Sequence, residues 1–161
     1  MARQVKVITA AEAAALIKNG DTVTTSGFVA SAIPEALDRA VEERFLATGE
    51  PRDITYVYCG SQGNKDGRGA EHFAHEGLLK RYIAGHWATV PALQKMALEN
   101  KMEAYNVSQG ALCHLFRDIA AHRPGCFTKV GLGTFIDPRN GGGKVNDVTK
   151  EDIIELVNIK G

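Results

Sequence analysis

Residues Ile54–Cys59 read ITYVYC, an unbroken run of β-branched and aromatic side chains closed by a cysteine. Such side chains are enriched in β-strands, and a short run of them between polar flanks is typical of a strand in a sheet. The polar, glycine-rich segment Gly60–Gly69 follows directly. This stretch therefore predicts a strand that ends in an irregular loop.

Working outward from this strand, strand-like and helix-like patterns alternate along the chain. The weaker strand-like stretches are Asp21–Thr25, Tyr82–Ala84, Glu103–Val107 and Phe127–Val130. Four stretches are helical. The first is Ala10–Ile17, with Thr9 as its cap and Asn19-Gly20 as its stop, and the second begins at Pro34 and has Leu37, Ala40, Val41 and Phe45 on one face. The other two are Pro91–Asn100 and Ser108–His122. Alternation of this kind predicts an α/β fold with an open, mostly parallel sheet flanked by helices.

The C-terminal part adds two weaker patterns. Val148–Leu156 reads as a capped amphipathic segment, and Val157–Gly161 reads as the beginning of a strand. We therefore expect one domain over residues 1–161, with its last strand incomplete.

Composition and charge limit the classes of function. Hydrophobic residues make up 44% and charged residues 24% of the 161 residues, and 19 Lys plus Arg balance 19 Asp plus Glu. The hydrophobic and charged fractions are typical of a globular domain with its own core. The equal numbers of basic and acidic residues leave no basic excess of the kind that nucleic-acid-binding proteins have. No apolar run has the length of a membrane span, and the first residues lack a signal-peptide pattern. We expect a cytoplasmic protein that binds neither nucleic acid nor membranes.

Cysteines and histidines give no pattern of a metal or nucleophile site. Cys59, Cys113 and Cys126 form no CxxC pair, so we interpret them as reduced thiols that fill space in the core. His72 and His75 lack a third ligand at metal-site spacing, and we expect no metal.

Thr25–Pro34 is the first loop with residues suited to chemistry. A strand ends there, Gly27 allows close backbone approach, and a helix follows, whose N-terminus favours anions. Alone, this segment is better explained as an ordinary strand-to-helix turn, because it is neither a GxGxxG nor a Walker sequence.

Asn106–Gly110 is the second such loop. Its Gln109 is expected at a strand-to-helix junction, where a neutral amide can donate a hydrogen bond to a developing oxyanion and Gly110 leaves room for a ligand. In the alternative interpretation Gln109 only caps the helix.

Val130–Lys144 is the third loop, long and rich in glycine and proline. Irregular loops of this length in small domains are frequently functional. Arg139 and Lys144 could meet a phosphate or carboxylate there, or simply be solvated on the surface.

Together these loops resemble the signatures of family I, glutamate-type coenzyme A (CoA) transferases. Asp21–Phe28 followed by Ala32–Pro34 is similar to the first signature, in which an acidic residue and an apolar run lead into Gly-Gly-Phe and then Gly-x-Pro. Ser26 and Ala32 depart from it, because the family has glycine at both positions.

The other two loops extend the resemblance. Ser108–Leu112 resembles the Pro-Gln-Gly-x-Leu motif of the same family. Gly131–Arg139, with the glycines and Lys144 after it, resembles a loop of the acetate and propionate CoA-transferase branch, as does Val148–Asp152. The ordered set covers nearly the whole chain and is more specific than any single motif.

The resemblance implies a fold, a reaction and a set of site residues. The fold is the open α/β sheet of sugar isomerases and CoA-transferases. In the reaction a glutamate attacks an acyl-CoA thioester, and CoA passes through a glutamyl-CoA thioester to a short-chain carboxylate. The CoA thioester is a substrate, and no cofactor is implied. Gln109 takes the role of oxyanion donor, and the implied substrate-binding residues are Ser26, Gly27, Phe28, Gly110, Gly131, Gly133 and Thr134.

The catalytic glutamate of the resemblance has no counterpart here. The family carries it in the second half, on a Glu-Asn-Gly or Glu-Thr-Gly motif, and neither tripeptide occurs in these residues. Glu99-Asn100 is followed by Lys101 and lies in a predicted helix. We therefore expect a piece of an enzyme that is inactive alone, with the rest of the enzyme or copies of itself as partner.

Two other readings stay open. The chain can be a non-catalytic binding or assembly module of the same fold, or a relative of sugar-phosphate isomerases. The second is weaker, because the Gln-Gly and Gly-Thr-Phe loops match transferases.

Overall fold

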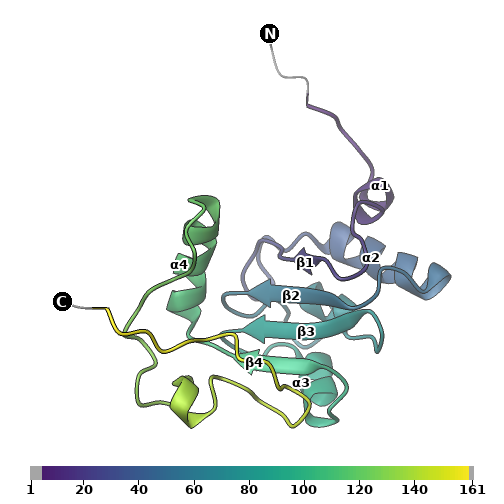
Figure 1. The fold of residues 1–161 in the computed structure, drawn as a ribbon. Helices are drawn as coiled ribbons and strands as arrows, with labels where there is room; N and C mark the ends of the chain where they lie inside the picture. The colour runs from purple at the N-terminus through teal and green to yellow at the C-terminus, as the bar shows by residue number, and fades with distance from the viewer. Residues whose placement is uncertain (1–4, 160–161) are drawn as a thin grey trace.

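The computed structural model describes residues 5–159 and contains a four-stranded parallel sheet in the order β1-β2-β3-β4 (Figure 1). The strands are β1 (Thr22–Val23), β2 (Ile54–Tyr58), β3 (Leu79–Ala84) and β4 (Glu103–Asn106). The α-helices are α1 (Ala10–Ala14), α2 (Glu35–Thr48), α3 (Pro91–Leu98) and α4 (Gln109–Ala120), and the 3₁₀ helices are η1 (Gly69–Phe73) and η2 (Pro138–Asn140). The α/β prediction with a parallel sheet is confirmed.

Local sequence explains where α1 begins. The Thr9 side chain accepts a hydrogen bond from the Glu12 backbone N–H at 3.2 Å, and the Glu12 carboxylate accepts one from the Thr9 backbone N–H at 2.8 Å. This reciprocal pair is the capping box that satisfies two otherwise unpaired donors. The helix is shorter than expected, since it ends at Ala14 and not at Ile17.

The two faces of the sheet are covered unequally. On one face Tyr56, Tyr82 and Ala104 lie in register and are fully buried under η1, α2 and α3, with the rings of Tyr56 and Phe73 4.7 Å apart. On the other face Tyr105 is buried, but Val57 and Ile83 beside it are only half-buried. Parallel sheets are usually covered on both faces, so this second face has apolar area left to bury.

The cover of that second face comes from distant segments. Leu112 and Leu115 of α4 pack there with Ile153 and Ile154 from the C-terminal segment. All strand arrows in Figure 1 point the same way, and α4 rises beyond their tips, at the carboxyl edge of the sheet.

Two predicted elements are wrong. Phe127–Val130 forms no strand, because its backbone has no neighbouring strand and Phe127 and Val130 stay exposed. Val148–Leu156, read as a capped amphipathic segment, forms no helix. The Thr149 hydroxyl instead accepts a hydrogen bond from the backbone N–H of Ala104 in β4 at 2.7 Å. No strand occurs at 157–159, and the rest of that predicted stretch lies outside the described residues.

The cysteine prediction holds only in part. Cys59 and Cys126 are half-buried, whereas Cys113 is exposed on α4. Among the helices within residues 5–159, none combines the length and apolar character needed to cross a bilayer.

Asp38 is a buried carboxyl on α2. It is 1% exposed, and neither of its oxygens has a hydrogen-bond partner among the residues described. It lines a mostly apolar cavity of about 190 Å³ between α1, β1 and α2. Burial, supported by the nearby Glu35 carboxylate and opposed by His72, raises the pKa of Asp38 to about 7.

Replacing Asp38 with asparagine is expected to stabilise the protein at pH 8 but not at pH 5. The folded pKa lies above the unfolded value of about 3.9, so the native carboxyl destabilises the fold progressively as pH rises from about 4 to 7. The asparagine amide would itself be buried without a hydrogen-bond partner, and that cost reduces the gain to about 1–2 kcal/mol at pH 8. Chemical denaturation at both pH values measures it, with the exposed Asp147→Asn as control. An equal gain at pH 5 and pH 8 would contradict the raised pKa.

Candidate active site at the carboxyl edge of the sheet

The loops after β1, β2 and β4 converge at one point. A methyl group built on Gly60, after β2, would lie 3.5 Å from the Gln109 amide nitrogen Nε2 and 3.5 Å from the ring of Phe28. Phe28 follows β1, and Gln109 opens α4 after β4. These three residues therefore meet where parallel α/β sheets bind ligands.

Gly27 gives the loop after β1 its shape. Its φ is +121°, and a methyl group there would lie 2.8 Å from Ile33 Cγ2 and 2.9 Å from the Ala32 carbonyl oxygen, so only glycine fits. Phe28 and Ser31 exchange two backbone hydrogen bonds of 2.9 Å, which hold the Phe28 side chain outward, 58% exposed. Ser26 before them is exposed.

Ala32 has a φ of +55° and occupies the second position where the resemblance has glycine. A left-handed conformation costs a residue with a Cβ atom on the order of 1–2 kcal/mol. The backbone shape that favours glycine is therefore present although the glycine is not.

Sequence reasoning missed Gln62, which ties the first two loops together. Its side chain is 0% exposed, and its Oε1 accepts hydrogen bonds from Thr25 Oγ1 at 2.7 Å and from the Tyr56 hydroxyl at 2.8 Å. Its Nε2 donates to the Ser26 carbonyl oxygen. A buried amide with all these partners fixes the loop after β1 against the loop after β2. A glutamine in a glycine-rich loop was the only signal in the sequence.

Gln109 is the first residue of α4 and is exposed. The capping position is taken by Ser108, and within residues 5–159 no hydrogen bond is made by the Gln109 side chain. The capping interpretation of Gln109 therefore has no support in this structure, and its amide is available to a ligand.

Gly85 holds the Gln109 backbone in place and was also missed. A side-chain carbon on Gly85 would overlap the Cys59 carbonyl oxygen and lie 2.8 Å from both the Cα and the Cβ of Gln109. Real Cβ atoms essentially never come so close, so this contact requires glycine. Next to it, the Val107 N–H donates to the Ala84 carbonyl oxygen at 3.0 Å.

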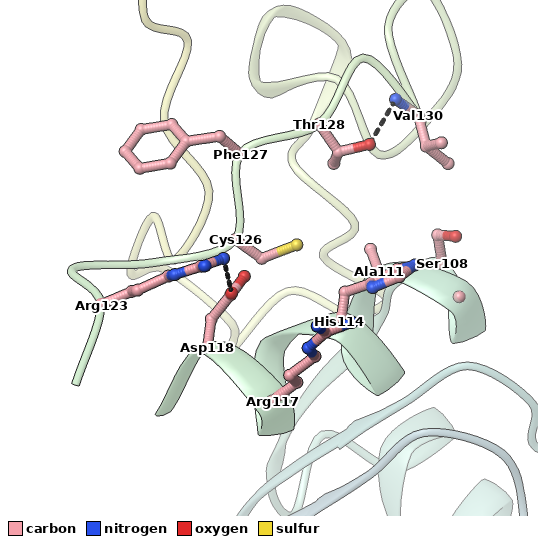
Figure 2. Close-up of a pocket in the computed structure, with 11 residues that line it drawn as sticks. Ser108, Ala111, His114, Arg117, Asp118, Arg123, Cys126, Phe127, Thr128 and Val130 are labelled. Carbon is pink, nitrogen blue, oxygen red and sulfur yellow. Dashed lines mark hydrogen bonds and ion pairs between the residues drawn. The ribbon is translucent and has the colours of Figure 1, made fainter. Parts of the chain in front are cut away.

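A hollow of about 510 Å³ lies between α4 and the segment that follows it (Figure 2). Ser108 and Gly110 line one end of it, and α4 faces the segment 123–130 across it. Figure 2 shows Arg117 and His114 on the helix side and Phe127 on the other, with Arg123 donating to Asp118 at 2.9 Å. The hollow offers cationic and apolar lining on the side of α4 that carries Gly110 and His114.

Gly131, Gly133 and Thr134 lie in a separate, internally bonded loop. The Gly133 N–H donates to Asp137 at 2.8 Å, and the Thr134 hydroxyl donates to the Gly131 carbonyl oxygen at 2.7 Å. In the described part of the chain, no hydrogen bond joins these three residues to 26–28 or 108–110. Val130, just before this loop, lines the hollow that Ser108 and Gly110 also line.

The cations of this loop already have partners. Arg139 pairs with buried Asp137 at 2.6 Å, and this guanidinium together with the Gly133 N–H holds the pKa of Asp137 well below its usual range. Lys144 pairs with Asp152. Both cations that the sequence offered for an anion are therefore engaged within the chain.

His72 and His75 are held by carboxylates. His72 bridges Glu35 at 2.8 Å and Glu42 at 2.5 Å, and His75 contacts the second oxygen of Glu42 at 2.5 Å. These pairs join η1 to α2 and give the histidines a structural role.

Comparison with known proteins gives consistent results. A family model described as coenzyme A transferase matches residues 7–160. The caffeate CoA-transferase of Acetobacterium woodii is 40% identical over 156 residues, which are 97% of this chain and 30% of that protein. The acetate CoA-transferase YdiF of Escherichia coli K12 is 40% identical over 156 residues, 96% of this chain and 29% of that protein.

Solved structures agree with these relatives. Acyl-CoA transferase YdiF from Escherichia coli O157:H7 matches as apoenzyme with a TM-score of 0.88 at 38% identity, over 96% of this chain and 30% of that one. Its thioester complex with CoA matches with a TM-score of 0.87 at 37% identity, over 94% of this chain and 30% of that one. The chain thus spans about 30% of the length of these relatives.

Proposed function

This chain belongs to the coenzyme A transferase family, and on that premise we propose that it supplies the oxyanion-stabilising part of an acyl-CoA:carboxylate CoA-transferase. The substrates are a short-chain acyl-CoA and a free carboxylic acid. The observation that carries the proposal is the convergence of Phe28, Gly60 and the Gln109 amide at the carboxyl edge of the sheet.

The family resemblance implies the chemistry. A glutamate carboxylate attacks the thioester carbonyl, forms an acyl-glutamyl anhydride and releases the CoA thiolate. The thiolate then attacks the glutamyl carbonyl, which gives glutamyl-CoA and releases the first acid as its carboxylate, and the second acid takes up CoA by the same two steps in reverse. Each attack passes through a tetrahedral oxyanion. Gln109 Nε2 donates to that oxygen, and its neutral amide does not pair with the attacking carboxylate. Phe28 shields the reacting carbon from water, and Gly60 leaves the space that the acyl group occupies.

We place the attacking carboxylate outside residues 1–161. The tripeptides that carry it in the resemblance do not occur in these residues. The residues named here act on a substrate that a second part of the enzyme also holds.

The partner surface is the half-covered face of the sheet. Val57 and Ile83 are half-buried there, and Phe127 and Val130 are exposed beside the hollow. Apolar area of this kind is usually covered by another segment or subunit. We expect either the rest of the enzyme or a second copy to bury it in a cytoplasmic complex.

A non-catalytic binding or assembly module remains the second candidate, favoured by the absent glutamate motif. It predicts that the chain associates with a larger protein without contributing to turnover.

An exchange assay with labelled acetate and an acyl-CoA tests the proposal. The pure 161-residue chain is expected to show no exchange, because it lacks the attacking carboxylate, and a mixture with the remainder of the enzyme is expected to show it. Turnover by the chain alone would contradict the placement of the nucleophile. A stable complex without turnover would favour the assembly module.

A further inference from the structure

Two thiols meet beside the proposed oxyanion donor. Cys59 directly follows β2 and packs against the cluster of Tyr105, Val107 and Leu112, next to Cys113 on α4; burial, helped by the Cys113 thiol, raises the pKa of Cys59. Both cysteines are free, Cys59 half-buried and Cys113 exposed. The proposed reaction uses neither of them.

The backbone also holds this pair together. The Cys59 carbonyl oxygen and the Gln109 Cα both pack against Gly85, so the end of β2 and the first turn of α4 contact the same residue. Gln109 and Cys113 are four residues apart on α4, and side chains at this spacing lie on the same helix face. Leu112, between them, is buried against the sheet and fixes the rotation of the helix.

We propose that Cys59 and Cys113 are a redox modification site, a dithiol that a low-molecular-weight disulfide such as glutathione disulfide converts to an intramolecular disulfide.

The reaction balances as two thiol–disulfide exchanges. The Cys113 thiolate attacks one sulfur of glutathione disulfide, a mixed disulfide forms, and the first glutathione thiolate leaves. The Cys59 thiolate then attacks Cys113 Sγ, the protein disulfide forms, and the second glutathione thiolate leaves. The two protons lost by the cysteines are taken up by the two glutathiones, which are the reduced product.

Exposure sets the order of the two steps. Cys113 is reached directly by the oxidant, whereas burial, followed by the neighbouring Cys113 thiol, raises the pKa of Cys59. A thiol of raised pKa reacts slowly with outside reagents and acts as the resolving partner once a mixed disulfide lies next to it.

The disulfide has a consequence that rests on the proposed function. Bridged cysteines hold their Cβ atoms about 3.5–4.5 Å apart, so closure fixes the first turns of α4 to the end of β2 and changes the position of Gln109 relative to Gly60. A misplacement of about 1 Å can cost on the order of 10²-fold in rate. We expect the oxidised enzyme to exchange CoA on the order of 10²-fold more slowly and to recover with dithiothreitol.

Peptide mapping tests the site without any need for turnover. The protein is incubated with glutathione disulfide, alkylated and cleaved after lysine and arginine except before proline, which places Cys59 on 53–65, Cys113 on 102–117 and Cys126 on 118–129. The expected result is a disulfide-linked pair of 53–65 and 102–117, with Cys126 alkylated. Glutathione left on Cys113 while Cys59 is alkylated, or a link to Cys126, would overturn the proposal.

Two variants sharpen the result. Cys126→Ser is the matched control and leaves the linked pair unchanged. Cys59→Ser removes the resolving thiol, so Cys113 accumulates as the glutathione mixed disulfide; a variant that gives no mixed disulfide would also count against the mechanism. A linked pair that forms without slowing exchange would refute the link to Gln109 and keep the modification site.

Discussion

Replacing Gln109 with alanine is expected to lower turnover by on the order of 10²-fold in the enzyme reconstituted from this chain and the remainder, with a smaller change in KM. Negative charge on the carbonyl oxygen grows between the thioester and the tetrahedral intermediate, so a fixed amide donor stabilises the transition state more than the ground state. Because the Gln109 side chain has no partner among residues 5–159, its loss is expected to leave the thermal midpoint nearly unchanged.

Gln94→Ala is the matched control. Gln94 lies on α3, and its amide donates to the Trp87 carbonyl oxygen at 2.7 Å, so its loss affects stability and not the carboxyl edge. Steady-state kinetics and thermal denaturation of both variants separate the roles. Normal turnover with a lowered midpoint for Gln109→Ala would show that this residue serves only the fold.

Gly85→Ala is expected to impair both folding and turnover. The added methyl group would overlap the Cys59 carbonyl oxygen and press on the Gln109 backbone, and neither backbone can yield without separating α4 from β2. Overpacking of this kind costs about 1–3 kcal/mol and more where backbone is the obstacle, and the displaced Gln109 adds a rate loss on the order of 10²-fold.

Gly125→Ala provides the comparison for Gly85→Ala, since no atom lies within 4 Å of a methyl group at Gly125. Denaturant titration and exchange kinetics are expected to be close to those of the parent chain for Gly125→Ala and strongly altered for Gly85→Ala. Equal behaviour of the two variants would contradict the tight contact at Gln109.

Local patterns were sufficient where a local interaction decides the structure. ITYVYC forms β2, and Thr9 with Glu12 begins α1, because strand propensity and capping act over a few residues. The same reasoning failed at Phe127–Val130 and at Thr149. The first has strand-like side chains but no strand to pair with, and the hydroxyl of the second binds the distant edge of β4.

The candidate site likewise contains residues that local sequence patterns predicted and residues that they missed. The first two loops were found from glycines, a proline and the Gln-Gly pair, and the structure brings Phe28 and Gln109 together. Gly85 and Gln62 were missed, because their importance lies in contacts between segments far apart in the sequence. The third loop was expected at the same site, but its glycines bond within the loop, around Asp137.

Mapping the CoA-bound glutamate tests the central claim most directly. The whole enzyme is incubated with an acyl-CoA in the absence of a second acid, denatured, digested, and searched by mass spectrometry for a glutamyl-CoA thioester. We expect the modified glutamate to lie outside residues 1–161, and Gln109→Ala to slow its formation on the order of 10²-fold. A CoA thioester on any glutamate within residues 1–161 would contradict it.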